Sequence, residues 1–379
     1  MAHRTNFITS LRQIPSLAER QDLSEVVAKY PLKCTHYYFN LIDLSDPNDP
    51  LARIVLPHTD ELKEWEWGAL DPSNEKAYTV LEGLQHKYDS TVLLLASNVC
   101  AGLCRYCFRK RLFLDGGRPE VLRDIDGAIR YIRLHTEITN VILSGGDALM
   151  LSTAKLKEWI RRLREIPHVQ IIRLGTKVPA YFPQRITSDP ELLELIARYS
   201  TPEKKIYIMA HFDHPRELTE EALEACHQLI RAGAIVVNQT PLIRGVNDDP
   251  QVLADLFRKL SFVGVAPYYV FQCRPTVGNR PYAVPIEEGY QIFETARGLC
   301  SGLAKRARFT MSHELGKIEI VALTEEYIVF KFHRAADNRN TGKVLVYHRN
   351  PEAYWLDDYV EEIAAHPLET ELFAPTVYV

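Results

Sequence analysis

Short apolar runs recur through the middle of the chain, from residue 91 onwards. They occupy residues 92–96, 140–144, 169–174, 205–210, 235–239 and 267–271. Most are followed by an amphipathic stretch with helical spacing, such as residues 154–163 and 217–230. Apolar runs of this length predict buried strands, and six strand-then-helix units predict a parallel sheet that is closed, or partly closed, into a barrel.

The two flanks have other patterns. The first ninety residues are predicted to be helical and irregular, because prolines interrupt them at positions 15, 31, 47, 50, 57 and 72. After Cys300 the pattern favours alternating strands at 308–311, 317–322, 327–332 and 343–347, then a polar helix around 351–364. We therefore expect an α/β protein with a helical N-terminal region (1–90), a partial (β/α)6 barrel core (91–300) and a C-terminal sheet extension (301–379) that is not an independent domain.

The unusual residues of the chain fall directly after the predicted strands. Three cysteines follow the first strand, and a Ser-Gly-Gly-Asp segment at 144–147 follows the second. Polar residues at 175–176, 211–215, 238–239 and 272–274 follow the remaining four. Because active sites of such barrels lie at the carboxyl ends of the strands, we expect these segments to share one rim.

The cysteines Cys100, Cys104 and Cys107 lie within one short loop, whereas the other four cysteines are scattered singly. Three thiolates can hold three irons of a cubane cluster and leave the fourth iron open to bind another molecule. Two alternatives remain open. The loop could carry three buried thiols without a cluster, or a zinc ion with His86 or His135 as a further ligand.

Composition and charge restrict the class of partner. The chain has 379 residues, of which 46% are hydrophobic and 25% charged, so it is long enough to bury a large core. Its net charge of −4 provides no field that would favour nucleic acid or an anionic membrane. No segment approaches twenty apolar residues, so we expect a cytoplasmic protein with small, diffusible partners, in a compartment that keeps thiols reduced.

A combination of motifs resembles the lysine 2,3-aminomutase family of radical S-adenosylmethionine enzymes. The resemblance spans residues 35–320, and its motifs lie at 46–50, 97–111, 143–149, 178–179, 183–186, 211–217, 238–247 and 267–273. It implies a [4Fe-4S] cluster on Cys100, Cys104 and Cys107, with the fourth iron chelated by S-adenosylmethionine. Reductive cleavage would then supply a 5′-deoxyadenosyl radical, chemistry that belongs to the cofactor.

The resemblance also implies which residues border S-adenosylmethionine. They are Ser144, Gly145, Gly146, Asp147, His211 and Gln239. The glycines allow close backbone approach, and the Asp147 carboxylate suits a ligand ammonium group. From the residues alone, an ordinary strand-to-helix turn at 144–147 stays open, as does a metal ion or a hydrogen-bonded turn around His211 and His214.

Family members of this type hold pyridoxal 5′-phosphate on a lysine, and the resemblance places Lys317 at that position. The resemblance also matches Lys87 and Tyr88 to a basic-aromatic pair that surrounds the phosphate and ring of the cofactor. It implies that Arg109 binds the carboxylate of the substrate. The chain departs from the pattern twice, because the glycine-rich run before the lysine keeps only its last glycine and Thr91 replaces a second arginine. Both losses weaken a phosphate cradle. Alternatively, the cations at 105–111 form a solvated basic edge.

Substrate choice departs further from the lysine-specific members. Two aspartates grip the distal ammonium of lysine there, and the matching positions here are Arg274 and Thr310. A buried arginine would repel that ammonium, which favours an acidic or neutral side chain over L-lysine. Arg274 could instead pair with Glu314. The cysteine-rich zinc segment of some members is also absent, because Cys300 is the last cysteine.

The leading hypothesis is therefore an isomerase, a radical S-adenosylmethionine and pyridoxal phosphate-dependent 2,3-aminomutase for an L-α-amino acid other than lysine. The second hypothesis is a relative that performs another radical reaction without pyridoxal phosphate, and the third is an iron-sulfur electron carrier. Electron carriers usually saturate every iron, which argues against the third. The leading reading implies an amino-acid substrate, an electron donor such as flavodoxin or ferredoxin, and a homo-oligomer.

Overall fold

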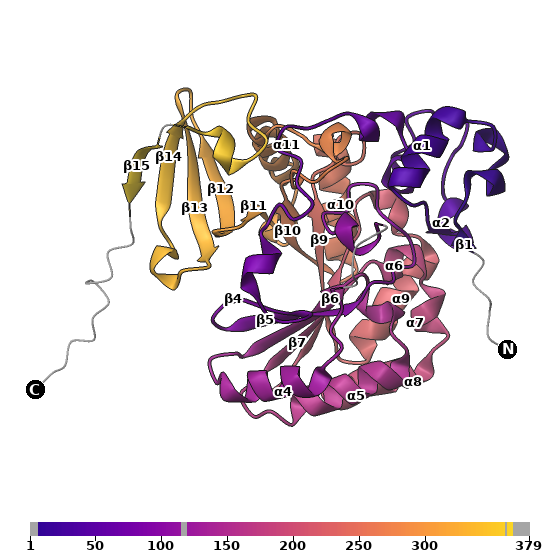
Figure 1. The fold of residues 1–379 in the computed structure, drawn as a ribbon, viewed down its shortest axis with the longest axis vertical. Coiled ribbons are helices and arrows are strands. Elements are labelled where there is room, and N and C mark those ends of the chain that lie inside the picture. The colour runs from indigo at the N-terminus through magenta and orange to yellow at the C-terminus, as the bar shows by residue number, and fades with distance from the viewer. Residues whose placement is uncertain (1–6, 115–119, 361, 367–379) are drawn as a thin grey trace, which may run out of the picture.

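One sheet of 13 strands organises the part of the chain that the structure describes. The structure is a computed structural model that describes residues 7–114, 120–360 and 362–366. The strands lie in the order β15-β14-β13-β12-β11-β10-β9-β8-β7-β6-β5-β4-β3, so neighbours in the chain are neighbours in the sheet. Figure 1 shows this sheet running from the barrel strands to the yellow C-terminal strands.

The middle of the sheet is parallel. It contains β5 (Thr91–Ser97), β6 (Asn140–Gly145), β7 (Ile171–Thr176), β8 (Ile206–Ala210), β9 (Ile235–Pro241) and β10 (Ala266–Phe271). All six predicted strands are confirmed. A seventh strand, β11 (Arg308–His313), continues parallel to β10. The strands at the two ends of the sheet, β3 and β15, do not pair with each other, so the α/β fold is a partial barrel, as predicted.

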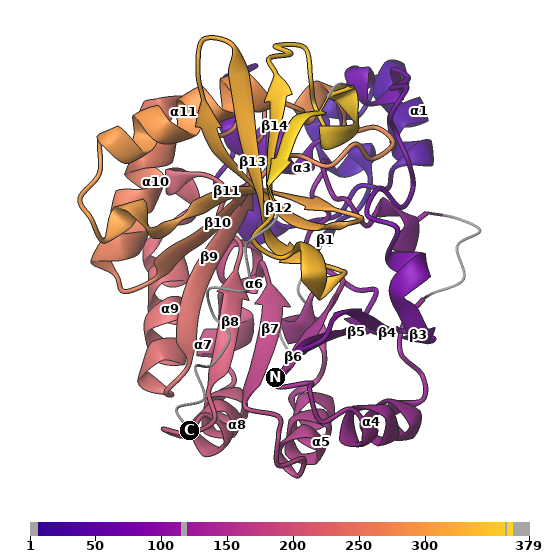
Figure 2. The same cartoon turned by 90° about the vertical axis from the view of Figure 1, so that its left-hand side faces the viewer.

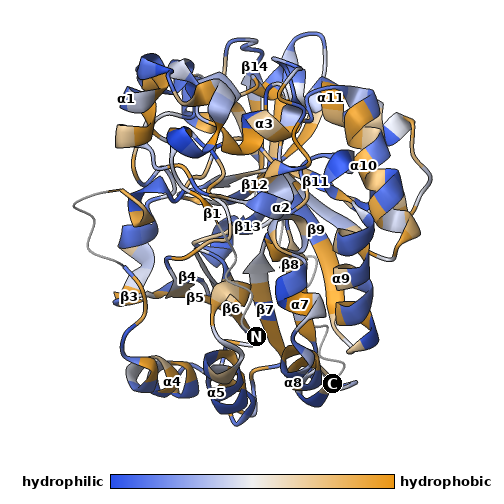
Figure 3. Ribbon diagram, turned by 90° about the vertical axis from the view of Figure 1, so that its right-hand side faces the viewer, coloured by the Kyte–Doolittle hydropathy of each residue, from blue (hydrophilic) through white to orange (hydrophobic). Residues whose placement is uncertain are grey.

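Amphipathic helices cover the outer face of the parallel strands (Figure 2). They are α4 (Ile125–Leu134), α5 (Thr153–Arg164), α8 (Pro190–Tyr199), α9 (Glu220–Arg231), α10 (Pro250–Phe262) and α11 (Ile286–Gly298), with short α6 (Val178–Tyr181) and α7 (Gln184–Thr187) after β7. In α5, Leu156, Trp159, Ile160 and Leu163 recur at helical spacing and are buried. Figure 3 shows the opposite, hydrophilic faces of such helices. No helix of the described residues is long and apolar enough to span a membrane.

The N-terminal region packs beside the barrel opening and is less helical than predicted. It contains β1 (Phe7–Ile8), β2 (Cys34–Thr35), α1 (Gln21–Lys29), α2 (His36–Phe39) and α3 (Pro50–Val55). It also contributes β4 (Leu84–Tyr88), which pairs antiparallel with β5, and β3 (Thr79–Leu81), which pairs antiparallel with β4 at the edge of the main sheet. Several prolines begin helices, such as Pro50 directly after the Asp49 cap. The domain boundary at residue 90 stays a prediction.

The C-terminal region continues the same sheet with antiparallel strands. The predicted strands are found as β11, β12 (Gly316–Leu323), β13 (Tyr327–Ala335) and β14 (Val344–His348). The predicted helix around 351–364 is wrong, because this segment holds a 3-10 turn at Leu356–Asp358 and the edge strand β15 (Glu362–His366). Trp355 and Tyr359 are buried against the C-terminal strands, and this packing overrides the polar helical pattern. Residues 361 and 367–379 of the predicted extension lie outside the described residues.

Candidate active site

The cysteine loop leaves the end of β5 and folds back onto the end of β6. The backbone N–H of Gly146 donates to the Ser97 carbonyl at 2.5 Å, and that of Asp147 donates to the Val99 carbonyl at 2.9 Å. A Cβ at position 146 would lie 2.7 Å from the backbone N and O of Val99. Gly145 has a φ of 107°, in the region that favours glycine. The two glycines therefore allow the approach of the cysteine loop itself.

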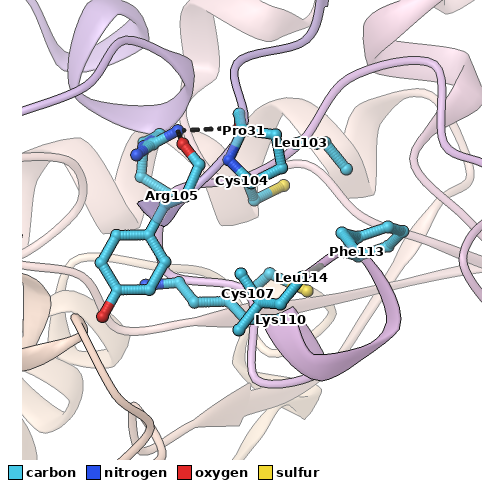
Figure 4. Close-up of a pocket in the computed structure, with 9 residues that line it drawn as sticks. Pro31, Leu103, Cys104, Arg105, Cys107, Lys110, Phe113 and Leu114 are labelled. Carbon is cyan, nitrogen blue, oxygen red and sulfur yellow. Dashed lines mark hydrogen bonds between the residues drawn. The ribbon is translucent and has the colours of Figure 1, made fainter. Parts of the chain in front are cut away.

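The three cysteines carry free, partly buried thiols. Cys104 and Cys107 lie on the wall of one pocket, together with Pro31, Leu103 and Phe113 (Figure 4). The Cys104 Sγ is 3.0 Å from the Tyr181 hydroxyl. Burial raises the pKa of Cys104 to about 12, so this thiol requires a nearby positive charge, such as iron, to become a thiolate ligand.

The histidines considered as zinc ligands are engaged elsewhere. His86 Nδ1 lies 2.9 Å from the Tyr131 hydroxyl, and the His86 and His135 rings are 5.6 Å apart. Within residues 7–114, 120–360 and 362–366, no three His, Cys, Asp or Glu side chains form a group that could hold a metal ion. This finding disfavours a preformed single-ion site. It leaves a four-iron cluster possible, because there the three thiolates bind different irons and stand farther apart.

A buried ion network lies beside the cysteine loop. Lys177 Nζ is 2.6 Å from Asp213 and 2.8 Å from Glu217, and both carboxylates are fully buried. His211 Nε2 contacts the same Asp213 at 2.8 Å, so one carboxylate orients this histidine at the barrel rim. Burial opposes the charge of Lys177, but the two carboxylates outweigh it and raise the pKa of Lys177.

The other residues predicted to border S-adenosylmethionine lie on the same rim. Asp147 accepts hydrogen bonds from the backbone N–H of Leu149 at 2.9 Å and of Lys177 at 2.7 Å. Its carboxylate thus ties the ends of β6 and β7 together, and its binding of an ammonium group stays a prediction. Gln239 pairs with Tyr269 across β9 and β10. His214 caps a turn by accepting from the Arg216 N–H at 3.1 Å, which favours the hydrogen-bonded turn over a metal ion.

Arg109 reaches into the barrel but is already paired. Its Nη2 donates to Glu75 at 2.6 Å, its Nε contacts both Glu75 oxygens at 3.1 Å, and its Nη1 donates to Ser144 at 3.1 Å. Arg111 donates to the other Glu75 oxygen at 2.6 Å. Although burial opposes it, these guanidinium groups lower the pKa of Glu75 well below its usual range. A substrate carboxylate would therefore share Arg109 with Glu75 or displace it.

The alternative of a solvated basic edge at 105–111 is wrong. Arg105, Arg109 and Lys110 are buried. Arg105 forms a bidentate pair with Glu61, at 2.7 Å for the shortest contact, and both side chains are almost fully buried. The ion pairs that Arg105 forms with Glu61 and Arg109 forms with Glu75 explain why the charges of this segment point inward.

Lys317 lies on β12, and its side chain faces two aromatic rings of β10. Its Nζ is 4.0 Å from the centre of the Tyr269 ring and 4.6 Å from that of Phe271. Burial lowers the pKa of Lys317 well below its usual range, and nearby cations lower it further; these are Arg274, Arg334, Arg173 and Lys87. A lysine with a lowered pKa is a better nucleophile towards a carbonyl at neutral pH.

Lys87 and Tyr88 lie in the same cationic environment. The Lys87 ammonium donates to the His313 carbonyl at 2.5 Å, and burial lowers its pKa to about 8. The Tyr88 ring lies under the Arg334 guanidinium at 4.2 Å. The structure therefore brings this pair near Lys317, although 229 residues separate positions 88 and 317.

Arg274 and Thr310 present polar atoms that have no partner in the part of the chain the structure describes. These atoms, Arg274 Nη1 and Thr310 Oγ1, are buried. The Arg274 guanidinium lies 3.6 Å from the centre of the Phe108 ring. The alternative pair with Glu314 does not form, because Glu314 bonds to Asn74 at 3.3 Å instead. Buried polar atoms normally have partners, so these two atoms suit a ligand.

Sequence reasoning missed several of these residues. They are Glu75, Arg173, Lys177, Asp213 and Arg334. Lys177 and Asp213 follow predicted strands, so their place at the strand ends was the available signal. Glu75 and Arg334 lie outside the predicted barrel core and carried no local signal.

Comparison with known proteins defines the class. The sequence model of the radical SAM superfamily matches residues 94–257, which begin within β5 and contain the cysteine loop. This match and the full-length similarity to the relatives below make the chain a radical SAM enzyme, and that family implies a [4Fe-4S] cluster and S-adenosylmethionine.

Relatives specify the family within this class. A protein of Aquifex aeolicus (strain VF5) named "Putative L-lysine 2,3-aminomutase" is 49% identical over 97% of this chain and 98% of its own length. The L-lysine 2,3-aminomutase of Clostridium subterminale is 39% identical over 75% of this chain and 67% of its own. The glutamate 2,3-aminomutase of Clostridioides difficile (strain 630) is 34% identical over 80% of this chain and 71% of its own length. The chain belongs to the lysine 2,3-aminomutase family, whose members are isomerases.

Proposed function

We propose that this protein is a pyridoxal phosphate-dependent 2,3-aminomutase that acts on an L-α-amino acid with an acidic or neutral side chain. One observation carries the proposal: Lys317 lies among four further cations, of which Arg274 presents a buried, partnerless Nη1. Nearby carboxylates such as Glu75 offset these charges only in part, so the site favours an anionic ligand. Pyridoxal phosphate and an amino-acid substrate carry such anions.

Arg274 and Thr310 are proposed to choose the substrate. A guanidinium beside a substrate ammonium, at about 4 Å and an effective dielectric constant near 20, repels it by about 4 kcal/mol. The same guanidinium can donate two parallel hydrogen bonds to a carboxylate, and the Thr310 hydroxyl can add a third. This arrangement opposes L-lysine and favours a substrate such as glutamate. The similarity to a relative named for glutamate supports the choice.

The chain's own residues hold and orient the reactants. Cys100, Cys104 and Cys107 are proposed to bind the cluster, and Lys317 to hold pyridoxal phosphate, which when bound stabilises the migration of the amino group. Arg109 is proposed to hold the substrate carboxylate, which would compete with Glu75 for its guanidinium. Tyr269 and Phe271 exclude water from the Lys317 amine.

The pyridoxal phosphate-free alternative is favoured by the segment before Lys317. Of a glycine-rich run, this segment retains Gly316, where a Cβ would lie 2.3 Å from the Arg334 carbonyl. His313, in the same segment, is buried and bonded to Asp357 at 2.9 Å. Fewer open backbone N–H groups weaken a phosphate cradle, so this reading predicts radical chemistry without a pyridoxal chromophore.

A substrate screen tests the proposal. The reconstituted, reduced protein is incubated without oxygen with glutamate, aspartate, glutamine, alanine and lysine, and the products are separated by chiral chromatography. We expect a 3-amino isomer from an acidic or neutral substrate and none from lysine. Arg274→Gln should raise KM for the acidic substrate, whereas Arg231→Gln, on the exposed end of α9, should leave KM unchanged. Turnover of lysine in preference to all others would contradict the proposal.

We further propose a small redox protein, such as flavodoxin or ferredoxin, as electron donor. The cluster needs single electrons to cleave S-adenosylmethionine, and a cytoplasmic location would provide such donors. A homo-oligomer is also proposed, to be tested by light scattering of the purified protein.

A further inference from the structure

Arg334 occupies a special position relative to Lys317. The two residues are direct partners across the antiparallel strands β12 and β13, so their side chains leave the same face of the sheet. The Arg334 Nη2 donates to the Ser90 hydroxyl at 3.1 Å and to the Thr91 hydroxyl at 3.2 Å. Its guanidinium lies 4.2 Å from the centre of the Tyr88 ring. Arg334 therefore connects Lys317 to the turn at Tyr88–Thr91, which is distant from both residues in the sequence.

A second guanidinium approaches from the barrel interior. Arg173 lies on β7 and donates to the Asn140 side-chain oxygen at 2.5 Å. Burial lowers the pKa of Arg173, and the charge of Arg334 lowers it further. Among the described residues, the side-chain hydrogen bonds of Arg173, Arg334 and Lys87 go to neutral oxygens and to no carboxylate.

Glu75, Asp71 and Glu314 act on Lys87, but no carboxylate in the part of the chain that the structure describes hydrogen-bonds to any of the three cations. A multiply charged anion between the cations would relieve their mutual repulsion. Arginine suits a phosphate, because its planar donors match two phosphate oxygens. The hydroxyls of Ser90 and Thr91 accept from Arg334 and lie 3.4 Å from each other, so one of their two protons remains available for a phosphate oxygen. Thr91 is also the position where the family pattern has an arginine, and here the guanidinium arrives at the same place from β13.

We propose that Arg334, supported by Arg173, binds the phosphate group of pyridoxal phosphate and takes the place of the arginine that is absent at position 91. This inference rests on the proposed function, because it assumes pyridoxal phosphate on Lys317. It assigns to β13, in the C-terminal extension, a direct part in cofactor binding.

The experiment compares two ligands that differ by the phosphate alone. Pyridoxal phosphate and phosphate-free pyridoxal are titrated into the cluster-loaded protein, and uptake is followed by absorbance and by borohydride-trapped mass on Lys317. Arg334→Gln should weaken pyridoxal phosphate by about tenfold or more, the loss expected for a charge-assisted hydrogen bond, and leave pyridoxal unchanged. Arg339→Gln, in the exposed turn after β13, is the matched control and should change neither.

A relocated arginine provides the second variant. Thr91→Arg in the Arg334→Gln background should recover part of the pyridoxal phosphate affinity without affecting pyridoxal. Equal losses for both ligands in Arg334→Gln would overturn the inference, because they would indicate a structural role. Unchanged affinities would also overturn it but leave the proposed function intact. A wild-type protein that takes up neither ligand would refute the proposed function, and this inference with it.

Discussion

Lys177→Met removes the cation that two buried carboxylates share beside the cysteine loop. Lys177 contacts Asp213 at 2.6 Å and Glu217 at 2.8 Å, and neither carboxylate is exposed to water. Breaking a buried ion pair by removing one partner costs about 3–5 kcal/mol, because the other charge stays buried without compensation. Natural domains are stable by about 5–15 kcal/mol, so the variant should lose a large share of its stability.

The pH dependence of this loss follows from the pKa of Asp213. Burial alone would raise that pKa, but the charges of His211 and Lys177 outweigh burial and hold it well below the usual range. The stabilisation is therefore present above the unfolded-state pKa of about 4 and is lost only as pH falls through the lower folded-state pKa. Without Lys177 a weaker counter-charge remains, so Asp213 should take up its proton at a higher pH in Lys177→Met than in the wild type, and this should remove part of the cost of the substitution. The difference in the free energy of unfolding between wild type and Lys177→Met should therefore be smaller at pH 5 than at pH 8.

Urea denaturation of the cluster-free protein measures this gap, with Lys157→Met on the exposed face of α5 as the matched control. The control should change the free energy of unfolding by no more than about 0.5 kcal/mol. Iron per chain after reconstitution provides a second readout, and Lys177→Met should lower it. If Lys177→Met cost no more than Lys157→Met at pH 8, the buried ion network would not exist as described.

Three further substitutions test other parts of the site. Cys104→Ala should abolish the iron-sulfur absorbance in the visible region. A variant that still binds four irons would show that Cys104 is not a cluster ligand. Gly146→Ala should cost about 1–3 kcal/mol, measured by urea denaturation, because its Cβ would collide with the Val99 backbone; an unchanged stability would show that the loop is not docked there. Glu75→Gln should destabilise the cofactor-free protein by about 3 kcal/mol and lower KM for the substrate, since Arg109 loses its competing carboxylate. A raised KM would instead indicate that Glu75 positions Arg109.

The barrel could be predicted because each parallel strand is a short apolar run with a helix behind it. Ile206–Ala210, for example, is almost wholly buried and precedes a Thr219-capped helix. The structure of residues 351–366 could not be predicted, because Trp355 and Tyr359 pack against distant strands and β15 forms by pairing with β14. Local pattern describes intrinsic preference, whereas an edge strand depends on its partner.

The three cysteines proposed as cluster ligands are close in sequence, so their grouping could be predicted from spacing alone. The partners of the cations could not, because they come from distant segments. Arg109 meets Glu75 across 34 residues, and Arg334 meets Thr91 across 243 residues. Such pairs depend on the register of strands such as β12 and β13, which sequence patterns specify poorly.

The central claim is that Lys317 holds pyridoxal phosphate in a radical SAM aminomutase. The most direct test is an anaerobic absorbance spectrum of the reconstituted protein before and after borohydride, followed by peptide mapping of the reduced adduct. We predict an iron-sulfur spectrum with an added pyridoxal band, fixed by borohydride on Lys317. An iron-sulfur spectrum without any pyridoxal contribution after added cofactor, or an adduct on another lysine, would contradict the claim.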